Sequence, residues 1–312
     1  MMHSRTTLFL LWVAVVVALC WGTLREIVKA SLENGYSSHI VIVPFITAYF
    51  IWSGRKTIFS KASYRTGTGA LVAAVGIIGF LSLVSFSPFA SGQTLVAAKL
   101  IAVFAMIIGG FIGFYGAHAF QAALFPFALL LLMLPLPSIL IEKVVYFLQK
   151  GSADLAYGLF SILGIPVHRE GFLLQLPGLT IEVAKECSGI NSSVALLITM
   201  LLVAFETLHT TSRRVIILLL TIPLSLVKNA IRIVTLTVLA LRVDPSFLTG
   251  RLHHEGGFVF FLLALAIMYP VWKLLCKTEQ KSGSRPISQP PALQHASGVA
   301  EQSADQFASG SD

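Results

Sequence analysis

The sequence predicts an all-α, polytopic integral membrane protein: a helical bundle of about eight transmembrane helices with a small extramembrane cap. Of its 312 residues, 56% are hydrophobic and only 12% are charged, about half the charged fraction of an ordinary soluble domain. The mean hydropathy is +0.83. Apolar runs recur along the chain, and most approach the roughly 20 residues that a helix needs to cross a bilayer.

Five of these runs lie in the first half of the chain, at 7–24, 38–53, 68–88, 96–116 and 119–136. The first follows a short basic N-terminus, as a secretory signal does. It is long, however, and no small-x-small cleavage site follows it. We therefore interpret it as the first membrane helix.

The stretch 137–186 has a different character. Residues 139–163 mix apolar and charged side chains, which predicts an amphipathic or re-entrant helix at the membrane interface. Residues 173–176 and 179–183 are short alternating runs around Pro177-Gly178, which predicts a β-hairpin. We therefore expect residues 140–186 to form a small cap on the periplasmic side.

The last three runs fall at 189–206, 214–241 and 256–275, and the chain then becomes rich in Ser, Gln, Pro and Gly. Such a composition cannot bury enough apolar surface to fold. We therefore expect one membrane domain at 1–276, which includes the cap, and a disordered cytoplasmic tail at 277–312.

Basic residues in short loops predict the orientation, because cytoplasmic loops are enriched in Lys and Arg. They cluster after the second run, before the seventh and after the eighth. The clusters contain Arg55, Lys56, Lys61, Arg65, Arg213, Arg214, Lys273, Lys277, Lys281 and Arg285. Eight helices with a cytoplasmic N-terminus place all three on the cytoplasmic face. The net charge of +8 then indicates orientation and contact with membrane lipids, not nucleic-acid binding.

Three polar motifs interrupt the apolar background, and this topology puts all three at the outer face. They are Glu186-Cys187-Ser188-Gly189 at the start of the sixth run, Lys228-Asn229-Ala230-Ile231-Arg232 within the seventh, and His253-His254-Glu255 before the eighth. Arg232 lies about 27 Å along its helix from Arg214 at about 1.5 Å per residue.

These residue types suit covalent catalysis. A thiolate is a strong nucleophile, and a helix N-terminus or a nearby cation stabilises it. Backbone N–H groups after Cys187, or Arg232, can stabilise an oxyanion. A histidine is a common proton donor to a leaving amine.

Each feature alone has a simpler explanation. A cysteine near a helix end is often a small packed residue, Lys228 and Arg232 can extend to headgroups, and the histidines can simply lie at the interface. Cys20 and Cys276 are interpreted as packing residues. Three cysteines without a C-x-x-C pair argue against a disulfide framework or a cysteine zinc site.

Two further protease motifs can be tested against the spacing. A zincin needs His-Glu-x-x-His, but Phe258 occupies the position of the second histidine. A rhomboid-like serine protease needs Gly-x-Ser-Gly, and here Cys187 precedes Ser188-Gly189. The sequence therefore favours neither.

In combination, the motifs resemble the exosortase/archaeosortase family of multi-pass membrane transpeptidases. The resemblance lies in Glu-Cys-Ser-Gly-Ile with Ser192-Ser193, in Asn229 and Arg232 as N-x-x-R, and in His253 four residues before Gly257. It spans 186–261; the first half of the chain resembles the family only in being a run of membrane helices.

The resemblance implies a bacterial exosortase-type cysteine transpeptidase. Cys187 would be the nucleophile, Arg232 would stabilise the oxyanion or thiolate, and His253 would donate the proton. His254, beside Glu255, is the alternative donor by local chemistry. Asn229, Ser188 and Gly189 are assigned to substrate binding, and no metal or organic cofactor is expected.

The resemblance also implies the substrates: secreted proteins with a C-terminal Pro-Glu-Pro motif, one transmembrane helix and a short basic tail. They would be cleaved at the outer face of the inner membrane and passed to an acceptor. We expect a basic residue, Lys185, Arg242 or Arg251, to meet the carboxylate of the motif.

The alternatives are a membrane transporter and a non-catalytic scaffold for exopolysaccharide assembly. A transporter needs polar residues through the whole depth of the membrane, whereas the third to fifth runs are nearly free of charge. Both alternatives predict that Cys187→Ala keeps function.

Overall fold

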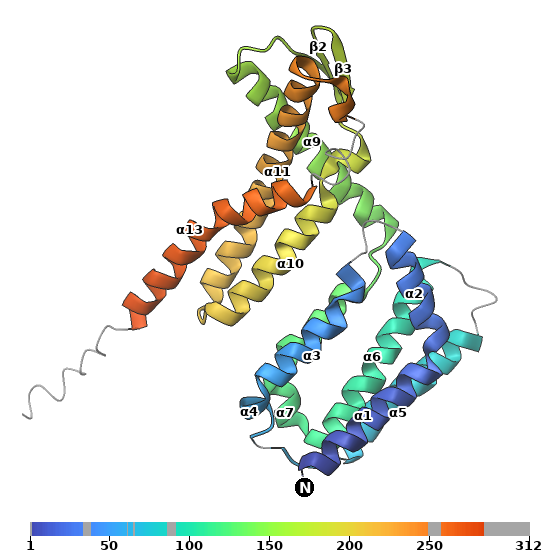
Figure 1. The fold of residues 1–312 in the computed structure, drawn as a ribbon. Helices are drawn as coiled ribbons and strands as arrows, with labels where there is room; N and C mark the ends of the chain where they lie inside the picture. Colours follow the sequence, from blue (N-terminus) through green and yellow to red (C-terminus); the bar gives the residue numbers. More distant parts are fainter. Residues whose placement is uncertain are drawn as a thin grey trace, which may run out of the picture.

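The computed structural model describes residues 2–33, 39–60, 62–64, 66–85, 92–248 and 257–283, which form two helical halves joined by a cap (Figure 1). The first half contains α1 (Met2–Leu19), α2 (Trp21–Glu33), α3 (Val43–Ser53), α4 (Arg55–Ile58), α5 (Thr66–Ser85), α6 (Gln93–Tyr115), α7 (Ala117–Ala122), α8 (Leu124–Leu129) and the 3-10 turn η2 (Leu130–Met133). The second half contains α10 (Ile190–Thr207), α11 (Thr211–Arg242) and α13 (Gly257–Gly283). The all-α membrane class is confirmed.

Within the described residues, five helices are long and apolar enough to cross a membrane: α5, α6, α10, α11 and α13. The number rises to seven if each of two bent pairs counts as one span. The predicted count of eight is not confirmed. Helix α3 has 11 residues, a length of about 17 Å, which is short of a bilayer core of about 30 Å.

The apolar runs conceal breaks that hydropathy cannot reveal. The run 7–24 bends by 71° between α1 and α2. The run 119–136 is divided into α7, α8 and η2, and this segment meets the next helix at 90°. Pro135 and Pro137 stand at that corner, and a proline has no N–H with which to continue a helix.

Glycines let α5 and α6 pack with their backbones almost in contact. A Cβ added to Gly109 would lie 2.4 Å from the backbone nitrogen of Ala73. One added to Gly69 would lie 2.3 Å from the backbone nitrogen of Gly113. Small residues at a helix interface are typical of membrane proteins, where close van der Waals packing replaces the hydrophobic effect.

The cap consists of helix α9 (Ser138–Ile162), the strands β1 (His168–Glu170), β2 (Leu173–Leu176) and β3 (Leu179–Glu182), and the upper end of α11 (Figure 1). The strands form one antiparallel sheet in the order β1-β2-β3. The predicted hairpin is therefore present, with an extra strand before it. Phe160, Leu174 and Ala230 are fully buried between α9, the sheet and α11.

Helix α9 confirms the predicted helix, but its faces are used in an unexpected way. Gln149 and Ser152 are buried against the protein, while the apolar Ile139, Phe147 and Ile162 are exposed. This arrangement suits a helix whose outer face meets lipid, because apolar side chains then gain nothing from facing inward.

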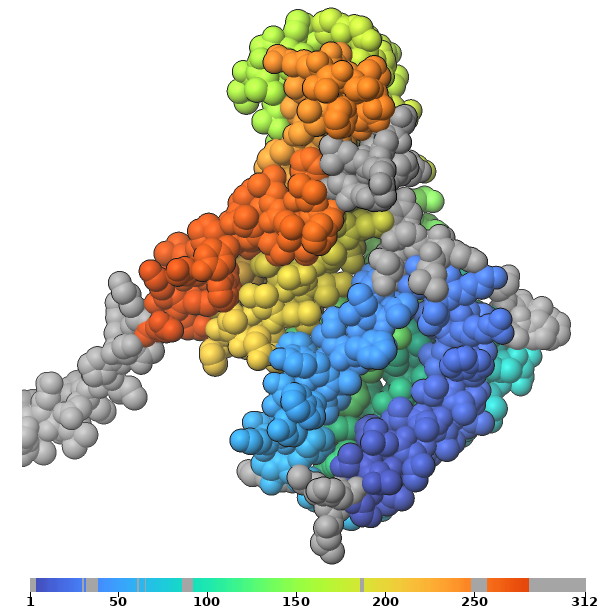
Figure 2. Space-filling model, in the orientation of Figure 1, coloured from blue at the N-terminus to red at the C-terminus, as the bar shows by residue number. Residues whose placement is uncertain are grey.

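The described parts of the three basic clusters lie at the end of the molecule that is remote from the strands. The N-terminus, α4, the turn between α10 and α11, and the end of α13 all lie there (Figure 1). In the space-filling view, α1 and α3 form one flank and α10 and α13 the other, with the cap above (Figure 2). The clusters thus occupy one end, as the predicted topology requires.

One predicted boundary is wrong. Helix α13 continues to Gly283, so residues 277–283 belong to a helix and not to the tail. Glu279 joins this end of α13 to the turn between α10 and α11, because its carboxylate accepts hydrogen bonds from the backbone N–H groups of His209 (3.1 Å) and Thr210 (2.7 Å). The rest of the predicted tail lies outside the described residues.

The close contact of α5 and α6 makes a prediction. Gly109→Leu should force the two backbones apart and lower the stability by at least about 1–3 kcal/mol, the usual cost of overpacking. The control is Gly79→Leu on α5, where an added Cβ meets no atom within 4 Å. Thermal unfolding of both variants in detergent measures the difference, and equal midpoints would contradict the packing described here.

Candidate functional site

The Cys-Ser-Gly motif forms the turn that enters α10. Residues Lys185–Ser188 make the 3-10 turn η3, and Gly189 follows with a left-handed φ of 71°. The backbone of Cys187 therefore lies directly before the N-terminus of α10, while its side chain lies outside what the structure describes. Ser188 is 1% exposed, and its Oγ finds no hydrogen-bond partner among the described residues.

This turn contacts the N-x-x-R motif of α11. A Cβ added to Gly189 would lie 2.7 Å from Oδ1 and 2.9 Å from Cγ of Asn229. Glycine is thus required at this position for two separate reasons, the positive φ and the closeness of Asn229. Two motifs that are forty residues apart in the sequence are in direct contact in the fold.

Helix α9 holds this contact from the other side. Asn229 Nδ2 donates a hydrogen bond to Ser152 Oγ (3.0 Å), and Gln149 Nε2 donates to the carbonyl of Val183 just before the turn. Both α9 side chains are buried. Gln149 and Ser152 were not among the predicted site residues, although two polar residues three positions apart on an otherwise apolar helix face were a usable signal.

Two cations lie one helical turn apart on α11, and Lys228, the first of them, contacts the start of α10. Lys228 is 1% exposed, and its Nζ donates to Ser192 Oγ, which in turn donates to the carbonyl of Gly189 (3.0 Å). Lys228 therefore does not extend to the headgroups. Arg232 lies one helical turn further toward the cap and is half-buried. Together they provide positive charge where a thiolate or an oxyanion would be stabilised.

Helix α13 begins at the same depth in the bundle as the first turn of α10. It runs alongside α10 in the same direction (Figure 1), and Trp272 Nε1 donates to Thr207 Oγ1 at 2.9 Å. Fifteen residues back from this bond, α13 begins at Gly257 and α10 has reached Ser192. His253, His254 and Glu255 precede Gly257 and lie outside the described residues, as does Arg251.

A cleft of about 1080 Å³ lies between α9 and the β2–β3 hairpin, next to the turn. Its lining includes the exposed Lys185, which directly precedes Glu186 and Cys187, and the aromatic Tyr146 and Phe172. Charges of both signs border it, from Glu142, Lys143 and Glu182. Among the described side chains, no three His, Cys, Asp or Glu residues come together as metal ligands.

Comparison with known proteins gives one finding. A family model described as transmembrane exosortase matches residues 30–270, well over half of the chain. No curated protein and no solved structure matches the chain. The matched range contains the cap and all three motifs, and it runs from the end of α2 into α13; α1 and most of α2 precede it.

The contact between the turn and α11 makes a prediction. Gly189→Ala should destabilise the protein more than Gly171→Ala, by about 1–3 kcal/mol for the clash with Asn229. Gly171 also has a positive φ, 62°, but no atom lies within 4 Å of an added Cβ, so this control incurs only the backbone strain. Thermal unfolding in detergent compares them, and equal losses would mean that Gly189 and Asn229 do not touch.

Proposed function

This chain belongs to the transmembrane exosortase family, and on that premise we propose that it is a membrane-embedded cysteine transpeptidase with Cys187 as nucleophile. The observation that carries the proposal is the contact of Gly189 with Asn229. It brings the Cys-Ser-Gly turn and the N-terminus of α10 to α11, one helical turn from Arg232, and this supports a reactive centre at that place.

The proposed reaction begins with attack of the Cys187 thiolate on the scissile carbonyl of a substrate. A bond forms between sulfur and carbon, and the developing oxyanion is stabilised by Arg232 and by the free N–H groups at the start of α10. The carbon–nitrogen bond then breaks, and the leaving amine takes a proton. The product is a thioester on Cys187, which an acceptor amine or hydroxyl resolves by transfer, or water by hydrolysis.

We assign the proton donor to His253, with His254 as the alternative. The support is the position of α13, which begins at Gly257 at the depth of Ser192. His253 precedes Gly257 by four residues, and four extended residues span up to about 14 Å.

The other predicted site residues fit a positioning role. Asn229 donates to Ser152 and packs on Gly189, which favours holding the turn over touching a substrate. Ser188 is buried beneath the same turn. Lys228 is held by its hydrogen bond to Ser192 and adds positive charge beside the start of α10.

The cleft between α9 and the hairpin suits an extended peptide that approaches Cys187. Lys143 and Lys185 on its border provide cations for a carboxylate such as the glutamate of a Pro-Glu-Pro motif, and Phe172 provides an apolar wall for proline rings. We propose that the cap lies on the periplasmic side of the inner membrane and that both termini are cytoplasmic, because the basic clusters lie at the opposite end.

The nucleophile is tested by processing in cells. A tagged secreted substrate with a Pro-Glu-Pro signal is expressed with wild-type protein, with Cys187→Ala or with Cys276→Ala, and its size is followed by immunoblot. We expect Cys187→Ala to abolish cleavage and Cys276→Ala, far from the site on α13, to retain it. Cleavage that persists without Cys187 would favour a transporter or a scaffold.

The proposed roles of the other residues predict a graded series of losses in the rate of cleavage. Arg232→Gln should lower the cleavage rate by about 10²–10³-fold, the usual effect of removing one oxyanion donor. His253→Ala should have an effect of similar size and His254→Ala a small one. The initial rates of cleavage measure all three against Arg25→Gln, at an exposed arginine on α2. An Arg232 variant as active as this control would exclude the proposed role.

A further inference from the structure

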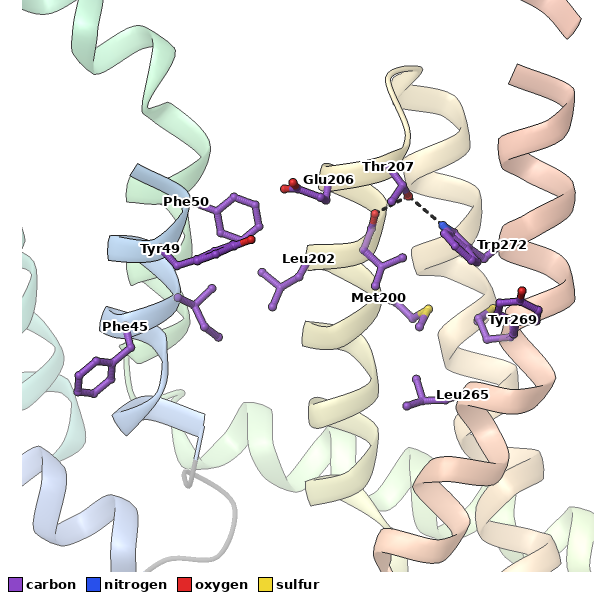
Figure 3. A pocket seen from close by; sticks show the side chains of 13 residues that line it. Phe45, Tyr49, Phe50, Met200, Leu202, Glu206, Thr207, Leu265, Tyr269 and Trp272 are labelled. Atoms are coloured by element: carbon purple, nitrogen blue, oxygen red, sulfur yellow. Dashed lines mark hydrogen bonds between the residues drawn. The ribbon is translucent and has the colours of Figure 1, made fainter. Parts of the chain in front are cut away.

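A second cavity lies between the two halves, in the part of the molecule that crosses the membrane (Figure 3). It has a volume of about 680 Å³ and is bordered by α3, α10 and α13. Its walls are formed mainly by aromatic, Leu and Met side chains. They include Tyr49, Phe50, Met200, Leu202, Met268 and Trp272.

The walls of this groove are not covered by another described helix. Phe45 on α3 is 73% exposed and Tyr269 on α13 is 54% exposed. The floor is closed where Phe205 of α10 stacks on Phe125 of α8 and contacts Phe50 at 6.2 Å between ring centroids. Phe205 of α10 therefore contacts both α3 and α8 of the first half beside the groove.

Glu206 is the one charged side chain among the described residues that border the groove. Its carboxylate points across the gap toward α3 (Figure 3), and no described residue pairs with it by a hydrogen bond or a salt bridge. Arg214, at the start of α11, donates to the carbonyls of Leu208 and Phe205. A carboxylate in an apolar wall favours a cationic partner.

The groove and the Cys-Ser-Gly turn lie on the same helix. Glu206 stands seventeen residues after Gly189 on α10, a rise of about 26 Å. The hydrocarbon core of a bilayer is about 30 Å thick. A helix that lay along α10 with a basic residue at Glu206 would therefore have its other end at the depth of Cys187.

We propose that this groove binds the transmembrane helix of the substrate, with a Lys or Arg beyond the end of that helix meeting Glu206. The inference rests on the proposed function, because it makes the groove the guide that delivers the preceding peptide to Cys187. A helix is favoured over a lipid for two reasons. Aromatic and Met-rich grooves are suited to apolar helix faces. The anionic lipids of the cytoplasmic leaflet would be repelled by Glu206.

Site-specific photo-crosslinking in Cys187→Ala protein tests the groove without requiring catalysis. The photoreactive amino acid p-benzoylphenylalanine replaces Phe45 in the groove or, as the control, Ile78 on α5, which is 65% exposed on a different helix. The tagged substrate carries its apolar helix and basic tail. We expect an adduct of substrate and enzyme from position 45 at least fivefold stronger than from position 78.

Equal yields at both positions, an adduct of two enzyme chains, or adducts with lipid alone would overturn the proposal. These results are distinct from failure of the proposed function, which would show as cleavage that persists without Cys187. A groove adduct together with cysteine-independent cleavage would leave the helix site standing and remove the nucleophile.

The role of Glu206 is tested separately with the same crosslink. Glu206→Gln should lower the yield from position 45 two- to fivefold for a substrate with a Lys- and Arg-containing tail. It should have no effect when the basic residues of the tail are replaced by Gln. Glu26→Gln, at an exposed acid on α2, is the matched control. An equal loss with both tails would show that Glu206 does not pair with the tail.

Discussion

The close approach of Gly189 to Asn229 is the contact on which the cap end of this protein depends. It fixes the start of α10 against the middle of α11 at a distance that no side chain larger than hydrogen allows. Helix α9 secures the same point through Ser152, and it secures the end of the hairpin through Gln149. The cap, the second half and the proposed nucleophile are therefore positioned by one small polar cluster.

That cluster explains how a fully buried lysine is tolerated. A cation within a membrane bundle is costly unless it is paired or hydrogen-bonded, and Lys228 has Ser192 as its acceptor. Ser192 and Ser193 both donate to the carbonyl of Gly189, so the turn, the serines and the lysine form one connected network. Arg232 follows Lys228 by four residues and therefore lies one turn further along α11 on the same face. Such an arrangement is expected where a negative charge develops during a reaction.

Much of this could be predicted from the sequence, because apolar runs and motif spacing are local properties. The long helices and the hairpin follow from them, as does the placing of the Cys-Ser-Gly and N-x-x-R motifs at one end of the bundle; the contact of Gly189 with Asn229 does not. The count of spans could not be predicted, since hydropathy does not show the 71° break after α1. Strand β1 has the sequence His-Arg-Glu and carries no apolar alternation. The inward face of α9 and the groove between the halves depend on tertiary packing, which a single sequence does not reveal.

The central claim is that the turn at Cys187 and the cation at Arg232 form one reactive centre. The most direct test is to look for the covalent thioester on purified protein incubated with a signal-bearing substrate, by mass spectrometry of its peptides and by release with neutral hydroxylamine. We expect an adduct on Cys187 that hydroxylamine removes and that is nearly absent in Arg232→Gln. Processing of the substrate with no adduct on Cys187, or an adduct of undiminished yield in Arg232→Gln, would contradict it.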